Sequence, residues 1–219
     1  GRVEVLGQDL SQRKVRRYIA RSVGYVFQNP DHQLFCRKVS DEVESGLKNL
    51  GLAAARRREL VEQTLRSVQL EQDADEDPLF LSKGQRQRLA VAAVLAMGPD
   101  ILVVDEPTTG QDHRSITSIM SLLCELQRQG KTILIITHDM TLVAEYCQRV
   151  VAFRDGEVAF NGTPTGLFES QRALEHTGLR PPASAALTAR LRSRYPHLPA
   201  LITVEQWRRA LLCIHAEQA

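Results

Sequence analysis

The sequence has 219 residues, enough for one large domain with an appendage, and 43% of them are hydrophobic and 25% charged, as in an ordinary globular protein. The net charge of +2 gives no electrostatic argument for binding nucleic acid or an anionic membrane. The longest apolar run, around residues 89–97, is too short to cross a bilayer, and no signal peptide is visible.

The first half of the chain predicts two strands followed by three helices. Residues 1–9 alternate and turn at Gly7, which favours an edge strand, and residues 22–28 favour a second strand. Helical spacing of apolar residues predicts helices from Ser40, across residues 53–70 and across residues 82–98, with Ser40 and Ser82 as N-caps. The acidic residues 71–78 predict a solvated loop.

Strands and helices alternate in the second half. Strands are expected at 101–105 and 132–137, helices at 113–129 and 140–147, and a strand pair around the Asp155-Gly156 turn. This alternation predicts parallel strands joined by crossovers, and therefore an α/β fold. The composition changes near residue 165, where we place a domain boundary.

Four cysteines are scattered along the chain without a C-x-x-C pair, at positions 36, 124, 147 and 213. This spacing favours reduced thiols of a cytosolic protein over disulfides or a metal site.

Polar residues end three of the predicted strands. Residues 101–104 predict a strand buried on both faces, yet it ends on Asp105 and Glu106. Ligands of open α/β sheets bind at this edge, and adjacent carboxylates of an extended chain point to opposite sides. One carboxylate can therefore hold a hard cation through water while the other polarises a water molecule. Gln28 and His138 end two other strands. The alternative is solvated turn residues and a capping or core histidine.

The stretch "LSKGQRQR" predicts an anion site at a helix N-terminus. Ser82 caps a helix whose first turn contains Gly84, and the free N–H groups of that turn attract anions. Glycine lets the backbone approach an anion closely. The alternative is an ordinary capped helix with Arg86 and Arg88 on a solvated face.

In chain order, these segments resemble the motifs of the ATP-binding cassette (ABC) ATPase family over roughly residues 1–165. Gln28 is similar to the Q-loop glutamine, "LSKGQ" to the signature LSGGQ, and "ILVVDEP" to the Walker B strand with its catalytic glutamate. "TTGQD" resembles the D-loop with Asp112, and "ITHD" the switch-histidine motif with His138.

A narrower resemblance, in "VFQNPDHQLF" and "GLRPP", is to the ATPases of energy-coupling factor (ECF) importers of cobalt, nickel and vitamins. It implies a P-loop NTPase-like parallel sheet core (1–30 and 96–165), an inserted helical subdomain (31–95) and a C-terminal extension (166–219). The implied function is the ATP-hydrolysing motor subunit of an importer, peripheral on the cytoplasmic face of the membrane. The implied partners are a second cassette, a transmembrane coupling subunit and a substrate-binding membrane subunit, without nucleic acid.

The resemblance also assigns roles around bound ATP and Mg²⁺. Asp105, with Gln28, would hold Mg²⁺, Glu106 would be the general base, and His138 and Gln28 would act at the terminal phosphate. The residues that would complete the nucleotide site of a second cassette are Ser82, Lys83, Gly84, Gln85 and Asp112.

Two departures from the family pattern stand out. Lys83 replaces the usual second glycine of the signature, where it could attract the triphosphate or hinder the backbone approach. The P-loop G-x-x-x-x-G-K-[ST] does not occur, since the "GKT" at 130–132 follows a helix and the residue five before Gly130 is Glu125.

We therefore expect a chain that begins, at a non-native Gly1, after the P-loop and its helix, and that is inactive alone with one sheet face uncovered. The alternatives are a non-transport cassette protein and a degenerate or truncated, non-hydrolysing cassette that completes a partner's ATP site.

Overall fold

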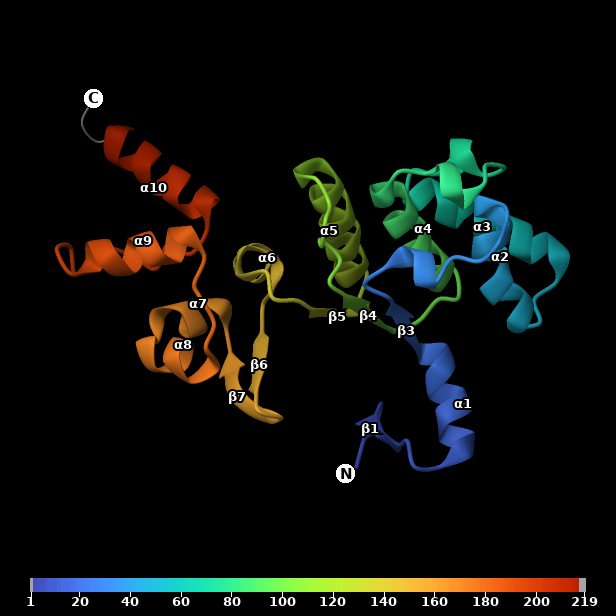
Figure 1. The fold of residues 1–219 in the computed structure, drawn as a ribbon, viewed down its shortest axis with the longest axis horizontal. Helices are drawn as coiled ribbons and strands as arrows, with labels where there is room; N and C mark the ends of the chain where they lie inside the picture. The colour runs from blue at the N-terminus through green and yellow to red at the C-terminus, as the bar shows by residue number, and fades with distance from the viewer. Residues whose placement is uncertain (1, 217–219) are drawn as a thin grey trace. The chain divides into compact units, whose positions relative to one another are not determined.

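The computed structural model describes residues 2–216, which form two compact units, one ending at Ile136 and the other starting at Thr137 (Figure 1). Among the described helices, none has both the length and the apolar composition needed to cross a membrane. The first unit contains a parallel sheet and a helical subdomain, and the second contains a hairpin and short helices.

The chain starts with a short hairpin and a helix. β1 (Glu4–Val5) pairs antiparallel with β2 (Gln8–Asp9), and Gly7 lies in the turn with a φ of 72°, so the predicted edge strand is a hairpin. The helix α1 (Arg13–Ser22) was not predicted, because its many charged residues obscure the four-residue spacing of Val15 and Ile19. Ile19 is buried, so this spacing was the available signal.

The sheet of the first unit has three parallel strands in the order β3-β4-β5, as the alternation predicts. They are β3 (Val23–Val26), β4 (Ile101–Asp105) and β5 (Thr132–Ile136), and the helix α5 (His113–Arg128) connects β4 to β5. Because the strands run parallel and in register, their carboxyl ends lie at one edge of the sheet (Figure 1).

Within the described residues of the first unit, only one face of this sheet is covered. Val26, Leu102 and Val104 are buried on one face, whereas Tyr25 and Leu134 are exposed on the other. The residues of β4 on that second face are only partly buried, so the prediction of a strand buried on both faces is wrong. The expected uncovered apolar face is present.

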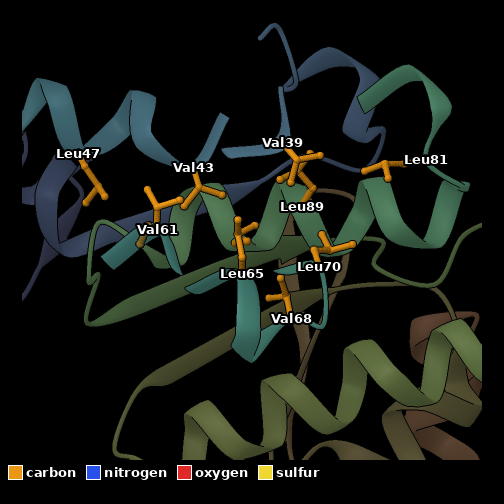
Figure 2. Close-up of a cluster of buried hydrophobic side chains, with 11 residues drawn as sticks. Val39, Val43, Leu47, Val61, Leu65, Val68, Leu70, Leu81 and Leu89 are labelled. Atoms are coloured by element: carbon orange, nitrogen blue, oxygen red, sulfur yellow. The ribbon is translucent and has the colours of Figure 1, made fainter. Parts of the chain in front are cut away.

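The helical subdomain packs three helices around one hydrophobic cluster (Figure 2). They are α2 (Val39–Asn49), α3 (Ala54–Ser67) and α4 (Lys83–Leu95), with short 3-10 helices at η1 (Pro30–His32), η2 (Glu71–Asp73) and η3 (Pro78–Phe80). The cluster brings together buried side chains of all three helices, among them Val43 of α2, Leu65 of α3 and Leu89 of α4. The predicted helical spacing therefore describes this core correctly.

The start of α2 differs from the prediction. Ser40 lies inside the helix, which begins at Val39 after Lys38, without a side-chain cap. The backbone N–H groups of Val39 and Ser40 donate to the carbonyls of Glu76 and Ala74, at 3.0 and 2.9 Å. These acceptors come from the predicted acidic loop, so a tertiary contact replaces the local cap.

The second unit contains α6 (Met140–Tyr146), the hairpin of β6 (Val150–Arg154) and β7 (Glu157–Gly162), and four further helices. The helices are α7 (Pro164–Glu169), α8 (Gln171–Thr177), α9 (Ala183–Arg192) and α10 (Val204–Ala216). Asp155 and Gly156 both have positive φ, of 52° and 82°, which confirms the predicted turn. A buried cluster includes Val143 and Ile202, on both sides of residue 165, and the boundary placed there stays a prediction.

Candidate nucleotide site

Asp105 and Glu106 lie at the carboxyl end of β4, but only Asp105 belongs to the strand. Glu106 has a φ of 44°, in the left-handed region that is strained for any residue other than glycine. Its backbone N–H donates to the carbonyl of Ile136 at 2.8 Å, and Thr109 Oγ1 donates to its Oε2 at 3.3 Å. The prediction that the Asp105 and Glu106 side chains point to opposite sides assumed an extended chain. That assumption is wrong, because the backbone turns at Glu106.

Tyr25 orients Asp105 from the neighbouring strand. The Tyr25 hydroxyl donates to Asp105 Oδ2 at 2.9 Å. This hydrogen bond, with some burial and the carboxylate charge, raises the pKa of Tyr25. Tyr25 was not predicted as a site residue. The register between β3 and β4 could have revealed it, because Tyr25 pairs with Val103 on the face of the sheet that also carries Asp105.

Gln28 is exposed and follows the end of β3 by two residues, at the same edge of the sheet as Asp105. The loop after it is held to the helical subdomain. Gln33 accepts from the N–H of Phe27 at 3.2 Å and donates to the carbonyl of Ala90, in α4, at 2.8 Å. The structure therefore brings Gln28 to the edge where Asp105 and Glu106 lie.

His138 follows β5 by two residues but belongs to the second unit. The next residue, Asp139, is the N-cap of α6 and accepts hydrogen bonds from the N–H groups of Thr141 and Leu142. The grouping of His138 with the two carboxylates stays a prediction.

The stretch "LSKGQ" begins α4 with a complete capping box. Ser82 Oγ accepts from the N–H of Gln85 at 3.3 Å, and Gln85 Oε1 accepts from the N–H of Ser82 at 2.9 Å. The predicted cap at Ser82 is confirmed. The alternative of a solvated arginine face is wrong, because Arg86 and Arg88 are partly buried and donate to the carbonyls of Leu81 and Val68.

The first turn of α4 packs against the start of α5. Gly84 is buried, and a Cβ at this position would lie 2.5 Å from Ser115 Oγ. A Cβ on Gly110, which has a φ of 67°, would lie 2.4 Å from Lys83 Nζ. The Lys83 side chain therefore extends over the "TTGQD" turn. This contact between the signature and the D-loop was not predicted.

Asp112 has a structural role at the end of that turn. It is the N-cap of α5, and it accepts a hydrogen bond from the N–H of Ser115 at 2.7 Å. That bond is the main cause of a lowered pKa at Asp112.

The described residues contain no group of three or more His, Cys, Asp or Glu side chains that could hold a metal ion. A site formed by protein ligands alone therefore does not fit. Mg²⁺ in phosphate sites is usually held by one or two carboxylates together with the phosphates, and Asp105 fits that arrangement.

The chain has the features of a nucleotide-binding domain of the cassette class. These are a parallel sheet with a helical subdomain, a carboxylate pair at a strand end and a capped "LSKGQ" helix. The ABC transporter family matches residues 1–109. Over 94% of its length, the chain is 41% identical to the energy-coupling factor transporter ATP-binding protein EcfA2 of Symbiobacterium thermophilum, and it covers 73% of that protein. The chain therefore belongs to the ABC transporter ATP-binding family.

Two other relatives agree with this assignment. A putative ABC transporter ATP-binding protein of Methanosarcina mazei is 42% identical over 94% of the chain, which spans 35% of that relative. The solved structure of cbiO1 from Clostridium perfringens, part of the ABC transporter complex cbiONQ, matches with a TM-score of 0.72 and 36% identity. The match covers 85% of this chain and 75% of cbiO1, and it confirms the predicted P-loop NTPase-like α/β fold.

The chain spans about a third of the length of several curated relatives, for example 35% and 33% of two Methanosarcina proteins. The relatives named as energy-coupling factor ATPases are shorter, and the chain covers 62% of the one from Methanothermobacter thermautotrophicus.

Proposed function

We propose that the chain forms part of the ATP-binding and ATP-hydrolysing motor subunit of an ECF-type importer, which couples hydrolysis to uptake of a metal ion or vitamin. The observation that carries this proposal is the carboxylate pair at the end of β4, where Tyr25 orients Asp105 and Glu106 lies in a strained turn. The identity to EcfA proteins and the likeness to cbiO1 support the importer type. The proposed location is the cytoplasmic face of the membrane, bound peripherally.

The proposed roles of the residues are those that the family motifs imply. Asp105, with Gln28, would hold Mg²⁺, and the Tyr25 hydroxyl fixes Oδ2 of Asp105. Glu106 takes a proton from water, with its carboxylate oriented by Thr109. His138 would contact the terminal phosphate. Bound Mg-ATP would supply the reacting phosphate together with partial neutralisation of its charge.

The start of α4 serves the nucleotide site of a second cassette. Its N–H groups and positive dipole end are suited to a phosphate. The residues proposed for this role are Ser82, Lys83, Gly84, Gln85 and Asp112. Because Lys83 lies over Gly110, the signature and the D-loop would meet the second cassette as one surface.

Turnover by the complete protein tests the assignment of Glu106. Glu106→Gln removes the proton acceptor while Asp105 stays, so we expect hydrolysis to fall by at least about 100-fold with ATP binding retained. Glu125→Gln is the matched control, since Glu125 is an exposed glutamate of α5 that pairs with Arg128. Hydrolysis by Glu106→Gln above a few per cent of the parent rate would show that Glu106 is not the base.

The membrane partner is proposed to contact the docking loop, which we define as residues 28–36. Phe35 is 76% exposed there, whereas Leu34 packs against the helical-subdomain cluster. An exposed phenylalanine beside polar turn residues favours a surface that another protein covers. Changing Leu34 would also damage the core, so Phe35→Asp alone is the sharper test.

Co-purification with the transmembrane coupling subunit measures this contact. We expect Phe35→Asp to abolish the complex, and Phe153→Asp, on an exposed phenylalanine of β6, to leave it intact. A normal complex with Phe35→Asp would count against the docking loop and against the ECF assignment.

A further inference from the structure

Glu42 is a buried carboxylate that bonds to the docking loop. It lies in α2 with only 1% of its surface exposed. Its Oε2 accepts hydrogen bonds from the backbone N–H groups of Phe35 and Cys36, at 2.9 and 2.7 Å. Burying a carboxylate is costly unless it is hydrogen-bonded, and bonds to an ionised acceptor are the stronger kind. This carboxylate therefore fixes two consecutive peptide units.

The docking loop is held at both ends by buried or partly buried side chains. Gln33 connects the N–H of Phe27 to the carbonyl of Ala90 at the start, and Glu42 binds residues 35 and 36 at the end. Phe35 therefore has its N–H bonded inward while its ring is exposed. These hydrogen bonds, together with the packing of Leu34 against the helical-subdomain cluster, fix the backbone that carries this ring.

We propose that Glu42 is a positioning residue, which holds the docking loop so that Phe35 is presented to the transmembrane coupling subunit. The proposal rests on the proposed function, because it assumes that the docking loop meets that subunit. It assigns to Glu42 no contact with the nucleotide or with the reacting atoms. Pre-organisation of a loop in its bound conformation lowers the entropic cost of binding, so losing Glu42 should weaken assembly.

The reactivity of the Cys36 thiol measures the Glu42 contact, and this measurement does not need the coupling subunit. Burial, the nearby Glu42 carboxylate and, to a smaller degree, Asp41 together raise the pKa of Cys36 to about 11, while Lys48 acts in the opposite direction. Removing the Glu42 charge should lower this pKa. Since the thiolate is the reactive form, a lower pKa makes alkylation faster at a fixed pH below it, although each thiolate becomes somewhat less nucleophilic.

The experiment compares Glu42→Gln and Glu42→Ala with Glu44→Gln in the complete protein. Glu44 is the matched control, because it lies in the same helix and pairs with Arg57 and Lys48 rather than with the docking loop. Alkylation of Cys36 by iodoacetamide is followed between pH 7 and pH 9.5 by mass spectrometry of its peptide. We expect the Glu42 variants to react at least about threefold faster and Glu44→Gln to stay within about twofold of the parent.

Hydrogen exchange distinguishes an effect of Glu42 on the docking loop from an effect on the stability of the whole helical subdomain. We expect faster exchange at Phe35 and Cys36 in the Glu42 variants, with the amides of α3 as well protected as in the parent. Equal acceleration in the docking loop and in α3 would overturn the proposal, because Glu42 would then act on the fold of the subdomain. Unchanged alkylation would overturn it as well, because the contact itself would be absent.

Affinity for the transmembrane coupling subunit completes the test. We expect the Glu42 variants to bind at least about tenfold more weakly, with Glu44→Gln unchanged. The positioning role would be overturned if the Glu42 variants showed a freed docking loop but bound the coupling subunit with normal affinity, and Phe35→Asp still broke the complex. Normal assembly of Phe35→Asp would instead show that the proposed function is wrong, so the two failures are distinguishable.

Discussion

Gly84→Ala tests whether the signature helix is packed against α5. In an unpacked first turn, alanine would stabilise the helix by about 0.5–1 kcal/mol. Here the added methyl group would lie 2.5 Å from Ser115 Oγ and 3.0 Å from Ser115 Cβ. The second atom is fixed to the backbone of α5, so a rotation of the Ser115 side chain does not remove the overlap.

The size of the effect follows from these two contributions. Overpacking of this kind costs about 1–3 kcal/mol, which exceeds the gain in helix propensity. We expect Gly84→Ala to lower the free energy of unfolding by about 1–2 kcal/mol. Ser115→Ala removes the nearer of the two atoms, so in that background the cost of Gly84→Ala should fall by about 1 kcal/mol.

Urea unfolding of the parent, the two single variants and the double variant measures this coupling, with far-UV circular dichroism as the signal. Trp207, the single tryptophan, gives an internal control because it lies in α10 of the second unit and bonds to the carbonyl of Ser184. Its fluorescence follows the unfolding of the second unit, which contains neither Gly84 nor Ser115. A Gly84→Ala variant as stable as the parent would refute the packing between the signature and α5.

Four further predictions concern the nucleotide site and the sheet. Tyr25→Phe should raise the Mg²⁺ concentration needed for ATP binding by the complete protein several-fold, and Asp105→Asn should lower the pKa of Tyr25 in an absorbance titration. Calorimetry on the 219-residue chain should find Mg-ATP binding no tighter than about 1 mM, since no P-loop cradles the phosphates, and micromolar binding would contradict this. Leu134→Lys, on the exposed face of β5, should reduce aggregation of the concentrated chain, measured by light scattering. Unchanged scattering would show that this face does not cause the aggregation.

Much of the fold was predictable because it depends on local pattern. Alternating strands and helices predicted the parallel sheet, and Ser82 followed by Gln85 predicted the start of α4. The turn at Asp155 and Gly156 was equally local. The position of Asp105 at the sheet edge followed from its place at the end of an apolar run.

The tertiary structure decided the features that depend on residues far apart in the sequence. Carbonyls of residues 74 and 76 set the start of α2, and Tyr25 reaches Asp105 only because β3 and β4 pair in that register. Gly84 illustrates the difference best. The sequence pattern explained the glycine at this position by the close approach of an anion. The structure shows a second reason for a residue without a side chain, because the Ser115 side chain of α5 packs against it. A pattern along the chain cannot reveal which surface a helix meets, because that surface forms only when both helices are packed.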